Sequence, residues 1–334
     1  MPASRPTDPA ALFEAARGGD QASLARLLSL VERGGPRSRE VAGLAYTTPG
    51  DAYTVGITGA PGAGKSTLTD RLVTLARQAG PDGGDRVAVL AVDPSSPYSG
   101  GAILGDRVRM PSHALDDRVY IRSMATRGHL GGLAVAVPDA VRVLSSVGMP
   151  VVLVETVGVG QQEVEVAAAT DTTVVVVNPG WGDAIQANKA GLLEVADLFV
   201  INKADRPGAR ETRRDLELML DLTELGPWRP AIVETVASAG DGVDELWATI
   251  GRHRDHQIEQ GTLAVHRRQR LEREFRQILA ARLRELTDGV LAGGGVDDIV
   301  RVMLDGEVDP YEAADRVVDR VMPSDPNAPS DSRD

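Results

Sequence analysis

The feature that most constrains the fold of this chain is a glycine-rich loop between a predicted strand and a predicted helix. Residues 59–66 read Gly-Ala-Pro-Gly-Ala-Gly-Lys-Ser, which matches the pattern G-x-x-x-x-G-K-[ST]. The apolar residues 52–58 before the loop predict a buried strand. Glycines allow the backbone N–H groups to face a phosphate, and a helix N-terminus adds positive partial charge. The loop therefore predicts binding of a nucleoside triphosphate, and a plain glycine-rich turn is the alternative interpretation.

The two polar residues of this loop have separate predicted roles. We expect Lys65 to contact the β- and γ-phosphates and the Ser66 hydroxyl to ligate Mg²⁺. The predicted phosphate-binding residues are Gly59, Ala60, Pro61, Gly62, Ala63, Gly64, Lys65, Ser66 and Thr67.

The rest of the central sequence alternates short apolar runs with helical stretches. Near-continuous apolar strands separated by helices are typical of a parallel sheet that is covered on both faces. The expected fold is therefore α/β, a P-loop NTPase with a mostly parallel central sheet flanked by helices. The predicted strands are residues 53–58, 87–92, 119–122, 151–154, 173–177, 198–201 and 231–236.

Helical patterns lie on both sides of this central part. The pattern at residues 8–33 breaks at Gly18-Gly19 and ends at Gly34-Gly35-Pro36. A long charged helix is predicted at 255–287, followed by helices at 296–304 and 310–321. We expect four regions: an N-terminal helical segment (1–48), a nucleotide-binding domain (49–254), a C-terminal helical region (255–322) and a disordered tail (323–334).

The sequence Asn202-Lys203-Ala204-Asp205 predicts which base is bound. A carboxylate at Asp205 can accept hydrogen bonds from N1–H and the 2-amino group of guanine, whereas adenine lacks that amino group. Each charge-assisted hydrogen bond contributes about 1.5–3 kcal/mol, so the site should prefer GTP to ATP. We expect Lys203 to cover the base, Asn202 to tie this loop to the phosphate loop, and Ser238 and Ala239 to form the last base-contacting loop. An ordinary capped turn is the alternative.

Three acidic residues are candidates for the surroundings of Mg²⁺ and for catalysis: Asp93, Asp106 and Glu155. Metal-assisted phosphoryl transfer needs carboxylates that position the ion and its waters. Gly158 follows Glu155 closely and could bring a backbone N–H to the γ-phosphate. The spacing does not decide which acid orients the attacking water, and a cap or surface position is the alternative for each.

The composition excludes several other classes of site. The 334-residue chain has no cysteine, which excludes disulfides, zinc–thiolate and iron–sulfur sites, and its five histidines are scattered. A net charge of −12 argues against nucleic acid as the main partner. No apolar run approaches the ~18 residues of a membrane helix, so we expect no membrane partner and a cytoplasmic location. A basic stretch is interleaved with acids and is interpreted as a solvated helix face, with a dedicated anion site as the alternative: Arg267, Arg268, Arg270, Arg273 and Arg276.

Together these motifs resemble a known family. Six segments carry the resemblance, and two of them, 100–110 and 121–132, are not shared by P-loop proteins in general. The full set is 59–67, 91–96, 100–110, 121–132, 155–161 and 202–205. The combination is similar to the MeaB/ArgK/MMAA-type GTPases, which are G-protein chaperones associated with methylmalonyl-CoA mutase, and it covers roughly residues 10–320.

The resemblance implies a homodimeric GTPase of the signal-recognition-particle/MinD/BioD (SIMIBI) class, with a helical C-terminal dimerisation arm. Family members use GTP binding and hydrolysis to gate adenosylcobalamin loading, protection and reactivation of an acyl-CoA mutase. The cobalamin is expected to stay on the partner, and the adenosyltransferase is a further candidate partner. The resemblance assigns Asp93, Asp106 and Glu155 to Mg²⁺ and catalysis, and it assigns a switch loop that couples to the client to Asp183, Gln186 and Lys189.

Alternatives remain for the client mutase and for the class of protein. Trp181, Asn188 and Ala190 stand where many family members have smaller or more basic residues. An isobutyryl-CoA or 2-hydroxyisobutyryl-CoA mutase is therefore an alternative client. A nickel-enzyme metallochaperone would need Cys or His ligands that this composition does not supply. A protein kinase tied to amino-acid transport would need kinase signatures that are absent from the sequence.

Overall fold

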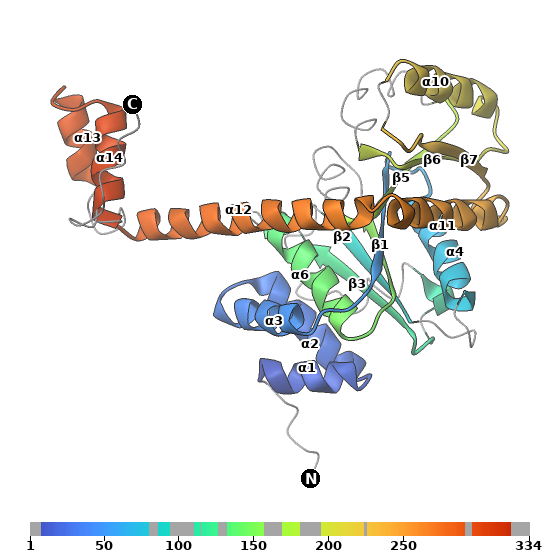
Figure 1. Cartoon of the computed structure of the whole chain (residues 1–334), viewed down its shortest axis with the longest axis horizontal. Coiled ribbons are helices and arrows are strands. Elements are labelled where there is room, and N and C mark those ends of the chain that lie inside the picture. The colour runs from blue at the N-terminus through green and yellow to red at the C-terminus, as the bar shows by residue number, and fades with distance from the viewer. Residues whose placement is uncertain are drawn as a thin grey trace, which may run out of the picture. The chain divides into compact units, whose positions relative to one another are not determined.

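A parallel sheet forms the core of the part of the chain that ends at Leu271 (Figure 1). The computed structural model describes residues 8–79, 86–93, 110–113, 115–125, 132–156, 169–180, 195–223, 226–290 and 296–321. Within these ranges the sheet has seven strands in the order β3-β2-β4-β1-β5-β6-β7, and all neighbours pair in parallel. The strands are β1 (Tyr53–Gly59), β2 (Val87–Asp93), β3 (Val119–Ala125), β4 (Val151–Thr156), β5 (Thr172–Val177), β6 (Leu198–Asn202) and β7 (Ala231–Thr235). The predicted α/β fold is confirmed.

Both faces of this sheet are buried because successive strand residues point to opposite sides. On one face, Leu90 and Val154 pack in a core with α1 (Pro9–Arg17), α2 (Gln21–Arg33), α3 (Pro36–Thr47) and α6 (Gly132–Ser146). On the other, Val89 and Leu153 pack with α4 (Lys65–Gln78) and α11 (Val243–Glu259). Helix α10 (Ala209–Asp221) covers β5 and β6 in a third core (Figure 1).

The N-terminal helices belong to the core of the sheet. Leu12, Leu27 and Leu28 are almost fully buried in the cluster that includes β2 and β4. Asp8 and Asp20 cap α1 and α2, accepting hydrogen bonds from backbone N–H groups at 3.1 and 3.0 Å. The predicted end of this helical pattern at Gly34-Gly35-Pro36 is confirmed, because α2 ends at Arg33 and Gly34 is its C-cap, but Pro36 also begins α3, a helix that the pattern did not predict. A proline suits the first turn of a helix, where its missing N–H has no intrahelical partner.

The long helix predicted at 255–287 is in fact two helices. Helix α11 ends at Glu259 and α12 (Thr262–Val290) begins after Gly261, whose φ of 69° is a left-handed value that favours glycine. The helices predicted farther on are confirmed as α13 (Val296–Leu304) and α14 (Pro310–Val321). The predicted tail at 323–334 lies outside the described residues.

Two compact units divide the chain, one ending at Leu271 and the other beginning at Glu272. The sheet and its covering helices lie in the first unit. The second holds the remainder of α12 together with α13 and α14, which contact each other. Every helix in the described ranges is too short or too polar to span a lipid bilayer.

Two arginines attach the start of α12 to the sheet. Arg267 and Arg270 both donate hydrogen bonds to the carboxylate of Asp171, whose side chain is 1% exposed. Burial alone would raise the pKa of Asp171, but the hydrogen bond from Arg267 and the charges of both arginines lower it below its ordinary value. The interpretation of the basic stretch as a wholly solvated face is therefore wrong for these two residues.

Candidate nucleotide-binding site

The glycine-rich loop connects the end of β1 with the start of α4. Three of its glycines have positive φ: Gly59 at 128°, Gly62 at 71° and Gly64 at 92°. A Cβ at Gly59 would lie 2.0 Å from the carbonyl oxygen of Val176 in the neighbouring strand β5. Gly64 precedes Lys65 as a left-handed residue, and no side chain caps α4. The first-turn N–H groups of α4 are therefore suited to bind an anion such as a phosphate.

Lys65 is folded onto the carbonyl groups of the same loop. Its Nζ donates to the carbonyl oxygens of Gly59 and Ala60, at 2.6 and 3.0 Å. The residue is only 7% exposed, so a positive charge is held beside the loop in a largely buried position. This placement supports the predicted role of Lys65 at the phosphates.

Ser66 and Glu155 are brought together from positions 89 residues apart. The Ser66 hydroxyl donates to Oε1 of Glu155, which lies near the carboxyl end of β4 and is 1% exposed. Strand β4 pairs with β1, so this contact follows from the strand order. A hydroxyl and a carboxylate are oxygen donors of the kind that Mg²⁺ prefers, and this pair fits such an ion.

Several predicted residues lie outside what the structure describes. Asp93 ends β2, beside β4 at the same edge of the sheet, but its side chain is not described. The others outside the described residues are Asp106, Gly158, Asp183, Gln186 and Lys189. Within the described ranges no group of three or more His, Cys, Asp or Glu is arranged to hold a metal ion.

Asn202 connects three segments of the site. Its Nδ2 donates to the carbonyl oxygen of Ala63 at 2.7 Å, which confirms the predicted tie between the two loops. Its Oδ1 accepts hydrogen bonds from the backbone N–H of Ala237 and from the hydroxyl of Thr235, both at 3.1 Å. Because Asn202 is 2% exposed, this one amide holds the phosphate loop, the end of β6 and the segment after β7 in a fixed arrangement.

Lys203 and Asp205 lie on the turn that follows β6. Lys203 has a φ of 60°, the one positive value among the non-glycine residues of the described ranges, and its Nζ donates to the carbonyl oxygen of Gly62 at 2.7 Å. This left-handed conformation costs about 1–2 kcal/mol, and such strain is often found at functional sites. Asp205 is exposed beside it, where a ligand can reach the carboxylate.

Ser238 and Ala239 lie on an exposed loop after β7. The N–H of Ala239 donates to the carbonyl oxygen of Val236 at 2.9 Å, and the N–H of Val236 donates to that of Asp241 at 3.0 Å. These bonds close a tight turn beside the segment that Asn202 holds. The structure therefore brings the predicted last loop to the same edge of the sheet as the phosphate loop.

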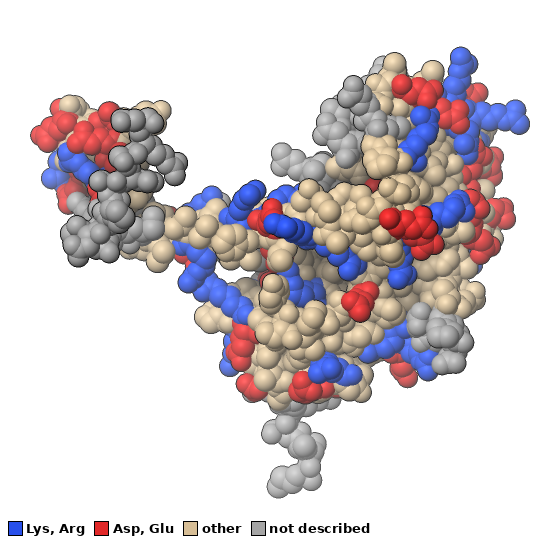
Figure 2. Space-filling model, viewed as in Figure 1, with Lys and Arg blue, Asp and Glu red and all other residues tan. Residues whose placement is uncertain are grey.

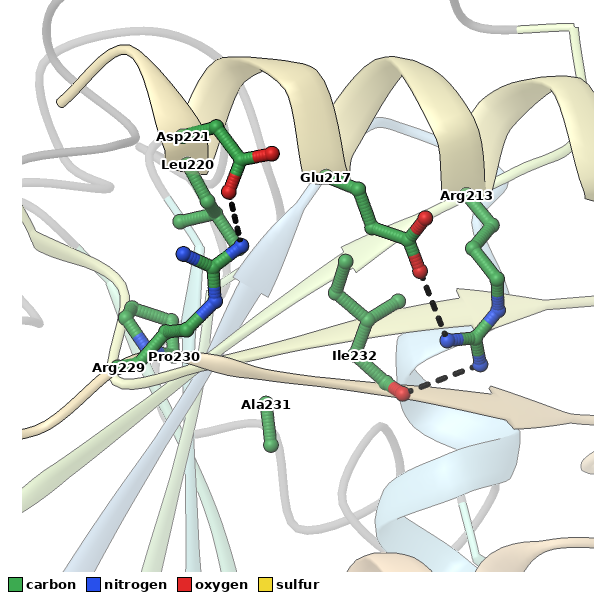
Figure 3. Close-up of a pocket in the computed structure, with 8 residues that line it drawn as sticks. All are labelled: Arg213, Glu217, Leu220, Asp221, Arg229, Pro230, Ala231 and Ile232. Carbon is green, nitrogen blue, oxygen red and sulfur yellow. Dashed lines mark hydrogen bonds and ion pairs between the residues drawn. The ribbon is translucent and has the colours of Figure 1, made fainter.

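A separate hollow of about 450 Å³ lies between α10 and the start of β7 (Figure 3). Its charged groups are paired: Arg213 with Glu217 at 3.5 Å, and Arg229 with Asp221 at 2.6 Å. Because the strands are parallel, the amino end of β7 lies at the opposite edge of the sheet from the phosphate loop. This hollow is therefore not the nucleotide site. Its lining residues are Arg213, Glu217, Leu220, Asp221, Arg229, Pro230, Ala231 and Ile232.

Comparisons with known proteins agree with this geometry. The family model described as "Methylmalonyl Co-A mutase-associated GTPase MeaB" matches residues 24–290. A protein of Pyrococcus abyssi that is named as a GTPase is 47% identical over 316 residues, covering 93% of this chain and 96% of the relative. The mitochondrial methylmalonic aciduria type A homolog of Mus musculus is 36% identical over 270 residues, covering 75% of this chain and 64% of that relative.

A solved structure is similar over almost the whole chain. It is the crystal structure of a protein named LAO/AO transport system kinase, with a TM-score of 0.68 and 26% sequence identity. The similarity covers 95% of this chain and 99% of that one. The two proteins therefore share this fold over nearly their whole lengths.

Proposed function

Because the chain belongs to the family of methylmalonyl Co-A mutase-associated GTPases MeaB, we propose that its GTPase activity serves an adenosylcobalamin-dependent acyl-CoA mutase. In this role the protein binds GTP and GDP and gates cofactor loading, protection and reactivation of the mutase, while the cobalamin stays on the partner. Methylmalonyl-CoA mutase is the first client to test. A mutase acting on isobutyryl-CoA or 2-hydroxyisobutyryl-CoA is the alternative client, and the adenosyltransferase is a further partner.

The hydrogen bond between Asn202 and the carbonyl of Ala63 is the observation that best supports a guanine-nucleotide site. It holds the loop of Asp205 against the phosphate loop, so that one nucleotide can contact both. In this arrangement Asp205 accepts from N1–H and the 2-amino group of guanine, and the stem of Lys203 covers the base. The N–H groups at the start of α4 bind the phosphates.

The residues around the terminal phosphate have distinct proposed roles. Lys65 moves its ammonium group from the carbonyls of Gly59 and Ala60 to the β- and γ-phosphates. Ser66 and Glu155, with Asp93 and Asp106, would hold Mg²⁺, and the ion would supply positive charge to the phosphates. One of the three acids orients the attacking water, and the N–H of Gly158 contacts the γ-phosphate. Asp183, Gln186 and Lys189 form the loop that couples to the client.

We also propose that the protein is a homodimer through its C-terminal helices. Helix α12 exposes apolar side chains at helical spacing: Phe275, Ile278, Leu279, Leu283 and Leu286. Figure 2 shows uncharged side chains between charged ones along this helix. A row of exposed apolar residues of this kind is usually covered by a partner in solution, and a second copy offers a matching row.

The substitution Asp205→Asn tests the nucleotide site. An amide at this position should weaken GDP binding by 100-fold or more and improve binding of xanthosine diphosphate, whose 2-oxo group accepts from the new amide. Glu211→Gln, an exposed acid in the first turn of α10, is the matched control and should leave both affinities unchanged. Equal GDP affinity in the Asp205→Asn variant and the wild type would refute the assignment of this residue.

Adding a purified mutase tests the partner. We expect GTP hydrolysis to rise and a complex to appear by size-exclusion chromatography with methylmalonyl-CoA mutase, because docking would order the loops around the γ-phosphate. The isobutyryl-CoA and 2-hydroxyisobutyryl-CoA mutases are tested side by side. If none of the three changes the hydrolysis rate or forms a complex, the chaperone role is refuted while the GTPase activity stands.

A further inference from the structure

We propose that Arg71 is a positioning residue that sets the affinity for the guanine base. The inference rests on the proposed function, because it takes the exposed loop at Ser238 and Ala239 to be a base-contacting loop. Arg71 lies on α4, the helix that begins with Lys65 and Ser66. It would act through the loop and not by touching the nucleotide.

The guanidinium of Arg71 binds two consecutive carbonyl groups of this loop. Its Nε donates to the carbonyl oxygen of Ala237 at 3.2 Å, and its Nη2 donates to that of Ser238 at 3.0 Å. The two partners are separated from Arg71 by 166 and 167 residues in the chain. A planar guanidinium can serve two neighbouring acceptors at once, which the single ammonium group of lysine cannot do with the same geometry.

The same loop is held on its other side by Asn202. The N–H of Ala237 donates to Oδ1 of Asn202, so both backbone polar groups of Ala237 are fixed by side chains from different elements. Asn202 in turn binds the phosphate loop through Ala63. The loop is therefore connected to the phosphate-binding segment by two routes, one through β6 and one through α4.

The route through α4 is short and stiff. Arg71 follows Ser66 by five residues, which corresponds to a rise of about 7.5 Å along an α-helix. A single side chain thus links the segment that would hold phosphates to the backbone that would face the base. Loss of this link removes one of these two routes, and the ordering that Arg71 provides would then have to be recovered on binding.

Arg71→Met tests this inference, since methionine keeps much of the apolar stem and removes the donors. We expect GDP affinity to fall about tenfold and KM for GTP to rise by a similar factor, with kcat within twofold. Arg71→Lys should recover part of the loss. Arg77→Met is the matched control on the same helix, because Arg77 pairs with Asp116 at 2.7 Å.

Competition by inorganic pyrophosphate separates loop positioning from general damage to α4. Pyrophosphate uses the phosphate loop but has no base, so its affinity should match that of the wild type in Arg71→Met. Equal losses for GDP and pyrophosphate, or unchanged GDP affinity, would overturn the inference. Wild-type protein that binds ADP as tightly as GDP would instead refute the guanine site itself, so the two failures are distinguishable.

Discussion

The carboxylate of Asp171 accepts hydrogen bonds from Nε and Nη2 of Arg267, at 3.1 and 2.8 Å, across 96 residues of chain. Arg270 donates to the same carboxylate, and the N–H of Thr54 donates to it at 3.0 Å. Asp171 directly precedes β5, at the end of the sheet opposite the phosphate loop. The first turns of α12 are therefore attached to β1 and β5 through one buried ionic group.

Replacing Asp171 by Asn should strongly destabilise the protein. The amide would remove the buried counter-charge of two arginines whose side chains are 38% and 18% exposed, and breaking a buried pair costs up to about 3–5 kcal/mol in free energy of unfolding. Asp221→Asn is the control. Asp221 pairs with Arg229 in an exposed position, so this substitution should lower the free energy of unfolding by about 1 kcal/mol or less. Urea denaturation measures both. Equal effects of the two substitutions would contradict this account of Asp171.

Replacing Asn202 by Ala should impair both folding and nucleotide binding. It removes a donor to Ala63 and an acceptor for Ala237 in a buried position, at a cost of about 1–3 kcal/mol for each group left without a partner. GDP affinity should fall by 100-fold or more. Asn178→Ala is the control. The Nδ2 of Asn178 reaches the carbonyl of Gly62 only at 3.5 Å, so this substitution should lower GDP affinity less than threefold. Isothermal titration gives the affinities, and similar losses for both variants would argue against Asn202 as the link.

A partly exposed Asp and a buried His near the amino ends of the strands predict an unusual dependence of stability on pH. Burial raises the pKa of Asp197 to about 7, and burial together with the charges of His256 and His266 lowers the pKa of His253 to about 4. Nε2 of His253 lies 3.4 Å from Oδ1 of Asp197. From about pH 4 to 7, folded Asp197 keeps a proton that the unfolded chain has lost, so its contribution to stability falls as the pH rises.

His253 has the opposite slope. The unfolded chain gains a proton on this residue below about pH 6.5 while the folded chain does not, so the contribution of His253 rises between about pH 4 and 6.5. The two contributions oppose each other in the wild type. Asp197→Asn removes one, and its free energy of unfolding should rise more steeply than that of the wild type from pH 4.5 to 6.5. Denaturation curves across this range test the slopes, and parallel slopes would show that Asp197 does not titrate as expected.

The proposed dimer predicts that charge on the apolar row of α12 will produce monomers. Phe275 and Leu279 are 62% and 45% exposed and lie one turn apart. Replacing both with Glu should weaken association by 100-fold or more, because each apolar side chain buried in an interface contributes about 1.5–3 kcal/mol. Arg276→Glu, on the same helix, controls for the added charge, and GDP affinity should be unchanged. Light scattering after size-exclusion chromatography reports the mass; a monomeric wild type, or a dimeric double variant, would refute the proposed interface.

The sequence by itself determined the features that depend on local pattern. The strands, the glycine-rich loop and the helices α13 and α14 follow from apolar periodicity and from glycine positions, which act over a few residues. The tie from Asn202 to the phosphate loop was also predictable, because parallel strands bring their carboxyl ends to one edge of the sheet. Local reasoning missed helix α3, which Pro36 begins, and it missed the break at Gly261, where one long charged pattern covers two helices.

Only the tertiary structure decided which distant side chains meet. An arginine in a charged helix has the same local pattern whether it faces water or a buried carboxylate, so Arg267 and Arg270 could not be separated from their solvated neighbours until α12 lay against Asp171. The same holds for Arg71 and the loop at Ala237, which are brought together by strand order and helix packing across 166 residues. These contacts form because folding brings together groups that no local spacing relates.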